Sequence, residues 1–382
     1  MWQLKKHYED TQKHLSYGEL DKLMQQLPNL EQQVNYRLLW KAGISQQLLR
    51  NLSTNYVSFF KALKDYDKHP AKYLGRPRPP KFRQDNYYYL PFDNQRFVKK
   101  GDKIQLKKDF FIPCPKQLLD KKICQVEIYY RYGYFEAIFS YETTETNIRL
   151  SKNDNILAID LGLNNLATCV SNGIIKPFVI NGRPLKSINQ YYNKRASKLK
   201  SVLKKRNDKD HSKKLEVLTR KRQRQLTDYL HKASHQLVTQ CVANQLTTVI
   251  IGNVQNSNTK INLGKRTNQN FVNLSLGQFI QKITYKLEKH HITVITREES
   301  YTSKASFLDT DTMPSKKQPE KQLFSGTRIK RGLYKSAKGV LINADVNGAY
   351  NILRKETPKF SADTITNKEG VAGWLHPYKL AV

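Results

Sequence analysis

Residues 156–168 read ILAIDLGLNNLAT. The apolar run at its start predicts a buried strand, and Asp160 follows at the end of that strand. Gly162 lets the backbone turn sharply afterwards, so the Asp160 carboxylate can face a cleft instead of the core. A buried, unpaired aspartate is costly, and we therefore expect Asp160 to hold a cation or a hydrogen-bond donor. The alternative is that Asp160 only caps a turn, as any Asp-x-Gly triplet can.

A second aspartate stands in a similar setting far downstream. Residues 343–352 read NADVNGAYNI, in which Asp345 precedes a helix-prone run. This arrangement favours a carboxylate on a helix that faces the same cleft as Asp160. Two separated carboxylates in a very basic chain indicate metal-dependent chemistry on a polyanionic substrate.

The charge balance indicates the class of partner. The 382 residues include 66 Lys plus Arg but only 32 Asp plus Glu, a formal net charge of +34. Such a chain repels itself unless a polyanion neutralises much of the charge, so we expect nucleic acid as the partner. The length predicts two or three domains, and a hydrophobic fraction of 38% is enough to bury a core in at least one of them.

Other classes of protein are disfavoured. No apolar run is long enough to span a bilayer and the N-terminus lacks a signal-peptide core, so we expect a cytoplasmic, nucleoid-associated protein. The cysteines lie far apart without a Cys-x-x-Cys pair, which leaves no readable disulfide framework and no expected structural zinc: Cys114, Cys124, Cys169 and Cys241.

The first part of the chain changes pattern twice. Helical spacing of apolar residues from about Leu15 to Tyr66 predicts a small helical domain. The Pro-rich and Arg-rich stretch 73–82 breaks helix and forms a basic connector or docking loop. Period-two alternation from Tyr87 to Tyr141 then predicts antiparallel strands, most clearly at 125–130 and 134–139. The many tyrosines there suit either stacking on bases or half-buried positions on a sheet.

The second part alternates strands with helices. Residues 155–178 predict a strand, a turn, a second strand and a hairpin, which is how a ribonuclease-H-like sheet begins. A long basic helical stretch covers 188–245, and a strand at 247–252, a helix at 271–288 and a strand at 292–296 then predict a parallel pair with a right-handed crossover. Glu298 or Glu299, after the last of these strands, could therefore reach the cleft that holds Asp160.

At these residues the chain resembles the TnpB (OrfB) family, the RNA-guided nucleases of insertion-sequence transposons that are related to type V CRISPR effectors. The block at 159–168 resembles the RuvC-like motif with the first metal ligand, and the block at 343–352 resembles the motif with the third. Tyr301-Thr302-Ser303 lies between them, as in family members.

The resemblance implies a multidomain α/β and β protein with an RNase H-like (RuvC) nuclease domain, a β-barrel wedge domain and a small helical recognition domain. The chain begins in a helix-like segment, so we expect the usual first wedge strand to be missing. The implied divisions are a helical recognition domain at 1–68, a wedge domain at 69–150, a nuclease domain at 151–355 with a basic helical insert at 188–245 and a cysteine-free lid at 304–340, and a C-terminal tail at 356–382.

Two departures from the family concern the site. Members usually place a glutamate directly after the strand that matches 249–251, where this chain has Gly252. A glutamate at the end of the adjacent strand could replace the missing one. Glu299 is the first choice and Glu298 the alternative. Members also often carry a zinc finger before the last aspartate, and here an apolar cluster is expected instead: Phe307, Leu308, Phe324, Leu333 and Tyr334.

The resemblance also implies an activity. Asp160, Glu299 and Asp345 would hold two Mg²⁺ (or Mn²⁺) ions and cut double-stranded DNA beside a short adjacent motif, with a transposon-encoded guide RNA selecting the target. The candidate nucleic-acid contacts are Arg76, Arg78, Lys81, Lys204, Lys205, Arg206, Arg220, Arg222, Lys304, Arg328, Lys330 and Arg331.

The sequence bears on three other functions. Gly252 favours a nuclease-dead, RNA-guided repressor, whereas the two retained aspartates favour retained chemistry. A guide-independent DNA-binding accessory of transposition is a further alternative. A strand-transferring transposase is disfavoured, because a tyrosine nucleophile needs paired metal-binding histidines and the adjacent His290 and His291 fall at a predicted helix end.

Overall fold

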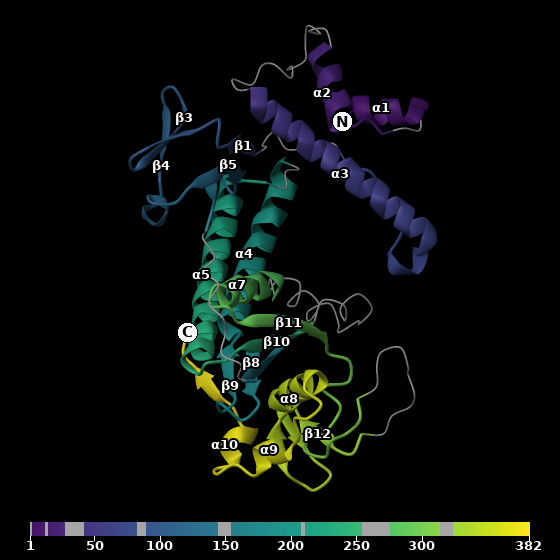
Figure 1. The fold of residues 1–382 in the computed structure, drawn as a ribbon, viewed down its shortest axis with the longest axis vertical. Coiled ribbons are helices and arrows are strands. Elements are labelled where there is room, and N and C mark those ends of the chain that lie inside the picture. The colour runs from purple at the N-terminus through teal and green to yellow at the C-terminus, as the bar shows by residue number, and fades with distance from the viewer. Residues whose placement is uncertain are drawn as a thin grey trace. The chain divides into compact units, whose positions relative to one another are not determined.

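The computed structural model describes residues 2–11, 14–26, 42–81, 89–143, 154–207, 211–253, 276–313 and 324–382. The chain divides into two compact units, Met1–Thr146 and Asn147–Val382. Figure 1 shows the first in purple and blue and the second in teal to yellow. Within the described ranges, no helix has the length and apolar character needed to cross a membrane.

Unit 1 opens with helices, as the spacing of its apolar residues predicts. These are α1 (Trp2–Thr11), α2 (Tyr17–Gln26) and α3 (Ala42–Lys68), followed by a short 3₁₀ turn η1 (Pro70–Lys72). Leu20 of α2 packs with Leu49 and Tyr56 of α3 in a small buried cluster. The connector after Tyr73 is irregular as far as Lys81, in keeping with its prolines.

The rest of unit 1 forms two three-stranded antiparallel sheets. One contains β1 (Leu90–Asp93), β5 (Ile123–Arg131) and β6 (Tyr134–Tyr141), and the other contains β2 (Val98–Lys100), β3 (Lys103–Lys107) and β4 (Phe110–Pro113); a 3₁₀ turn, η2 (Lys116–Leu118), precedes β5. Tyr132 and Gly133 join β5 to β6 with positive φ angles of 50° and 78°, a conformation that suits a tight hairpin. The predicted strands are present, and the β-barrel wedge stays a prediction.

Unit 2 is built on a six-stranded sheet in the order β11-β10-β7-β8-β9-β15. The strands are β7 (Ile156–Leu161), β8 (Asn165–Ser171), β9 (Phe178–Asn181), β10 (Thr248–Asn253), β11 (Thr293–Glu298) and β15 (Tyr378–Leu380). β7, β8 and β9 form an antiparallel meander, while β10 runs parallel to β7 and β11 runs parallel to β10. This is the ribonuclease-H-like arrangement expected from the sequence, including the parallel β10–β11 pair.

Helices cover both faces of this sheet (Figure 1). The basic stretch is two helices, α4 (Arg183–Asn207) and α5 (Lys213–Ala243), which contribute with α7 (Leu276–Glu288) to one core. Helix α8 (Ala344–Glu356) contributes to the core on the opposite face. Strand β7 alternates between them, since Leu157 and Ile159 belong to the first core and Ala158 to the second.

The segment 356–382, expected as a C-terminal tail, is folded. It contains α9 (Asp363–Thr366), α10 (Ala372–Leu375) and β15, which pairs in parallel with β9. Phe360, Ile365 and Trp374 are buried in the α8 core. These elements are too short to produce a periodic sequence signal, so only pairing with a sheet already in place reveals them.

Candidate active site

Asp160 and Asp345 are brought to one place by β7 and α8. Asp160 lies near the end of β7, and Asp345 lies in the first turn of α8. The Asn343 side chain caps that helix, because its Oδ1 accepts hydrogen bonds from the backbone N–H of Asp345 at 3.0 Å and of Val346 at 3.1 Å. Gly162 is needed for space, since an added Cβ would lie 2.8 Å from the Asn165 carbonyl oxygen.

The Asp160 carboxylate lies against the backbone of α8. A Cβ added at Gly348 would stand 3.0 Å from Asp160 Oδ2, so a side chain there would crowd the carboxylate. Burial, the Glu299 carboxylate and the Asp345 carboxylate together raise the pKa of Asp160 well above its usual value, and Arg328 opposes this rise. A bound cation would relieve the repulsion between these carboxylates.

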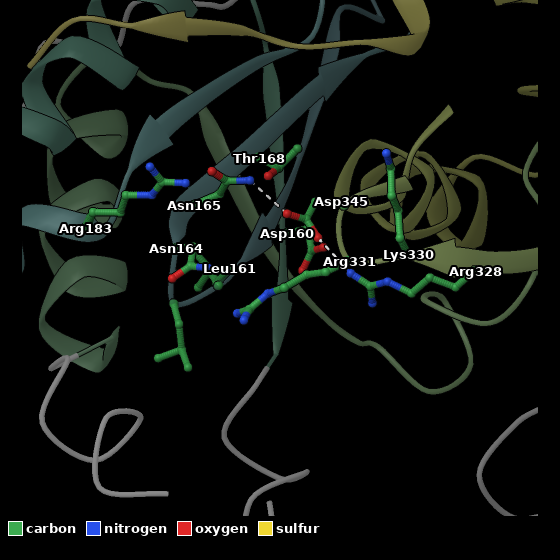
Figure 2. A pocket seen from close by; sticks show the side chains of 13 residues that line it. Asp160, Leu161, Asn164, Asn165, Thr168, Arg183, Arg328, Lys330, Arg331 and Asp345 are labelled. Atoms are coloured by element: carbon green, nitrogen blue, oxygen red, sulfur yellow. Dashed lines mark hydrogen bonds and ion pairs between the residues drawn. The ribbon is translucent and has the colours of Figure 1, made fainter. Parts of the chain in front are cut away.

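Asp345 has two polar neighbours. Asn165 Nδ2 donates a hydrogen bond to Asp345 Oδ2 at 2.8 Å, and Arg328 Nη2 lies 3.7 Å from Asp345 Oδ1. Figure 2 shows the two aspartates beside one another between these partners. Asn165 was not among the predicted site residues. Its position in the same motif as Asp160 is the sequence signal that could have identified it.

Glu299 occupies the space beside Gly252. A Cβ added at Gly252 would lie 2.0 Å from Glu299 Oε1 and 2.8 Å from its Cγ and Cδ. Because Ile251 of β10 pairs with Ile159 of β7, Gly252 lies at the level of Asp160. The Glu299 carboxyl group therefore enters the volume that a side chain from position 252 would otherwise fill.

The Glu299 carboxyl group is buried enough to disturb its ionisation. Its Oε1 is buried and has no hydrogen-bond partner among the described residues. Burial raises the pKa of Glu299 to about 7, and Lys355 acts in the opposite direction. Glu298, the competing choice, is exposed and accepts a hydrogen bond from Ser300 Oγ. Only Glu299 of this pair lies against Gly252.

The raised pKa of Glu299 predicts a pH-dependent stability in the absence of divalent metal. A carboxyl group that binds its proton more tightly in the folded state stabilises the fold at low pH, and this contribution is lost as pH rises from about 4.5 through about 7. The free energy of unfolding in EDTA, relative to Glu299→Gln, should therefore fall by up to about 3 kcal/mol between pH 5 and pH 8. A difference that does not change with pH would contradict this prediction.

The donor atoms fit a hard divalent cation. Asp160, Glu299 and Asp345 offer only carboxylate oxygens, which suit Mg²⁺ or Mn²⁺ better than zinc, and the buried Glu299 Oε1 lacks a partner. As they stand, no three His, Cys, Asp or Glu side chains in the described ranges are gathered closely enough to hold a metal ion. The carboxylates are thus electrostatically coupled without forming a closed set of ligands.

A cavity of about 910 Å³ opens beside the two aspartates. Its wall includes four cationic side chains as well as the motif residues 160–165: Arg183, Arg328, Lys330 and Arg331. Figure 2 shows these cations around Asp160 and Asp345. A carboxylate pair with surrounding cations can accept a phosphodiester, because the cations offset the phosphate charge next to a metal site.

The other predicted nucleic-acid contacts are dispersed. Arg76, Arg78 and Lys81 are exposed in unit 1, and Lys204, Lys205, Arg206 and Lys304 are exposed in unit 2. Arg220 is half-buried in α5. Arg222 contacts its own fold, because its Nε donates to Asn189 Oδ1 at 2.7 Å and its guanidinium lies 4.8 Å from the centre of the Tyr192 ring.

The lid combines apolar packing with a polar network that the sequence analysis missed. Phe307 and Tyr334 are buried, Leu308 packs against the same core, Leu333 is partly buried, and the Phe324 ring lies 6.1 Å from that of Tyr301. Strands β12 (Thr327–Lys330), β13 (Leu333–Lys335) and β14 (Leu341–Asn343) form a small antiparallel sheet.

Two aspartates connect the segments of this lid. Asp309 Oδ2 accepts from Ser306 Oγ at 2.6 Å and from Ala337 N at 2.8 Å. Asp311 accepts from Ser306 N at 2.8 Å and from Ser325 Oγ at 2.5 Å. Hydrogen bonds to carboxylates thus connect segments that a zinc ion and cysteines often hold together in the resembled family.

The fold and the carboxylates define a ribonuclease-H-like domain with an acidic site. The family model OrfB_IS605, described as "probable transposase", matches residues 138–258, and the model described as "Cas12f1-like, TNB domain" matches residues 277–352. The chain is therefore a TnpB-like relative of the type V effectors, as its motifs predict. The two matched regions include Asp160, Glu299 and Asp345.

Similar solved structures include a Cas12f1–sgRNA–target DNA complex and a CRISPR-Cas12f ternary complex. The first is 15% identical and covers 79% of this chain and 70% of that chain, with a TM-score of 0.48. The second is 15% identical and covers 91% of this chain and 77% of that chain, with a TM-score of 0.38. No curated protein matches the sequence.

Proposed function

We propose that this protein is an RNA-guided DNA endonuclease of an insertion-sequence transposon. It would act in the cytoplasm, at the nucleoid, and cut double-stranded DNA beside a short adjacent motif. The observation that carries the proposal is the position of Glu299, whose carboxyl group enters the space beside Gly252 and, after burial, contributes with Asp345 to the raised pKa of Asp160. The two family matches and the charge of +34 support a guide RNA and target DNA as partners.

Asp160, Glu299 and Asp345 would hold the metal ions, and the three carboxyl groups would have to draw closer together to complete the ligand set. Two bound Mg²⁺ or Mn²⁺ ions would activate the attacking water and stabilise the leaving 3′ oxygen, which leaves a 5′ phosphate on the product. Asn165 would orient Asp345 through its hydrogen bond. Arg328 and the neighbouring cations of the cavity would hold the phosphate backbone.

The test is cleavage of a plasmid library. The full chain would be expressed with its flanking transposon-end RNA and given a guide-matched target beside randomised sequence, with and without Mg²⁺. Metal-dependent, guide-dependent cleavage with an enriched adjacent motif is the expected result. Guide-dependent retention of the target without cleavage would instead support the repressor, which Gly252 favours as the second candidate. Specific DNA binding by RNA-free protein would support the transposition accessory.

Gly252→Ala is expected to reduce cleavage by about tenfold or more with little loss of stability. The added methyl group would lie 2.0 Å from Glu299 Oε1, so the carboxyl group must move, and the end of a flexible side chain can do so cheaply. Cleavage rate and melting temperature would be measured together. In a Glu299→Ser background the same substitution should have little further effect, and an equally large effect there would contradict the displacement of Glu299 as the cause.

A further inference from the structure

A row of three polar side chains on helix α8 contacts the end of β11 and the segment that follows it. Asn347, Asn351 and Lys355 are spaced four residues apart, so they lie along one face of the helix. Both asparagines are fully buried, whereas Lys355 is half-buried. Buried amides in an otherwise apolar core are kept only where they make hydrogen bonds, so their partners indicate what they do.

The asparagines hold the backbone that follows Glu299. Asn347 Nδ2 donates to the Ala305 carbonyl at 2.8 Å, and its Oδ1 accepts from Phe307 N at 2.9 Å. Asn351 Nδ2 donates to the Thr302 carbonyl at 3.0 Å and to the Ala305 carbonyl at 2.8 Å. The turn 302–307 is therefore tied to α8 at three backbone positions.

Lys355 holds the backbone on both sides of Glu299. Its Nζ donates to the Ser300 carbonyl at 2.6 Å and to the Glu298 carbonyl at 3.3 Å. The Glu299 carbonyl accepts in turn from Thr302 Oγ1 at 2.9 Å. Because Glu299 lies beyond the last residue of β11, the sheet itself no longer fixes its side-chain direction. The hydrogen bonds from Lys355 and Thr302 hold the backbone at Glu299, whose carboxyl group lies beside Gly252.

We propose that Lys355 and Asn351 are positioning residues that hold Glu299 over Gly252, and that α8 thereby sets the spacing of all three carboxylates. Helix α8 carries Asp345, meets Asp160 at Gly348 and binds the backbone around Glu299. A glutamate displaced to the end of β11 can serve a site on β7 only if a rigid element fixes it there, and α8 is that element. This inference deepens the proposed function and rests on it.

Lys355→Met is the test, because methionine keeps most of the side-chain volume but cannot donate to the two carbonyls. Lys359→Met, in the exposed segment after α8, removes the same charge and is the matched control. Lys355→Arg keeps a charged donor and should retain more function than Lys355→Met. Mn²⁺ binding to the RNA-free full chain would be measured by titration calorimetry. The binding that remains in the double variant Asp160→Asn/Asp345→Asn would be subtracted as background.

Lys355→Met is expected to weaken Mn²⁺ binding by about tenfold or more and to speed amide hydrogen exchange in residues 299–303, while Lys359→Met changes neither. Cleavage by the RNA-loaded protein should lose kcat rather than KM for target DNA, and excess Mn²⁺ should restore part of it. Unchanged Mn²⁺ binding and exchange in Lys355→Met would overturn the inference. So would faster exchange throughout unit 2, because this would indicate a purely structural role.

The two proposals fail differently. One outcome is that Lys355→Met weakens Mn²⁺ binding and local protection from exchange, while the wild-type protein cuts no guide-matched DNA. This outcome would support the positioning role and refute the endonuclease. The other outcome is that the wild-type protein cuts guide-matched DNA, while Lys355→Met changes neither Mn²⁺ binding nor amide exchange. This outcome would support the endonuclease and refute the positioning role.

Discussion

Asp160→Asn and Asp345→Asn are each expected to reduce the rate of cleavage of guide-matched DNA by about 1,000-fold or more, while RNA binding is retained. Each substitution keeps the shape of the side chain and removes one anionic metal ligand. Burial and the charges of the Glu299 and Asp345 carboxylates together raise the pKa of Asp160. Removing one charge should therefore leave the fold at least as stable in the absence of metal.

The measurement is single-turnover cleavage beside RNA retention on the same preparations. Asp154→Asn is the matched control, because Asp154 is an exposed aspartate just ahead of β7. It should cut at the wild-type rate. Cleavage that persists in Asp160→Asn, or a parallel loss of cleavage and RNA binding, would count against the assigned metal ligands.

Moving the acidic side chain from position 299 to position 252 is expected to restore activity that its removal destroys. Glu299→Ser should lower cleavage by about 100-fold or more, because it removes a carboxylate at the metal site. The Cβ of a side chain at position 252 would lie 2.0 Å from Glu299 Oε1. Gly252→Asp or Gly252→Glu, combined with Glu299→Ser, should therefore recover about tenfold or more of the loss.

Two controls separate this swap from a general effect of charge. Glu298→Ser removes the exposed neighbour of Glu299 and should leave cleavage near the wild-type rate. Gly252→Glu with Glu299 intact should gain nothing, because the two side chains compete for one volume. Loss of cleavage in Glu298→Ser but not in Glu299→Ser would assign the metal ligand to Glu298. If neither Gly252→Asp nor Gly252→Glu restores cleavage in Glu299→Ser, the idea that positions 252 and 299 share one volume is refuted.

Much of unit 2 could be predicted because its signals are local. The apolar run before Asp160 and the β-branched run before Gly252 are long enough to identify buried strands, and a helix between two strands implies a parallel pair. The helix start at Asp345 also has a local signal, because the Asn343 side chain caps it. The net charge of +34 likewise follows from composition alone and indicates a polyanionic partner.

The sequence by itself therefore determined the strands that precede Asp160 and Gly252, the parallel crossover and the pairing of Asp160 with Asp345. Only the tertiary structure placed Glu299 beside Gly252, placed Asn165 on Asp345 and paired residues 378–380 with the sheet. The physical reason is that alternation along a strand stops at its end, so the direction of Glu299 depends on hydrogen bonds from α8, far away in the chain. Contacts between distant segments have no period that a sequence can display.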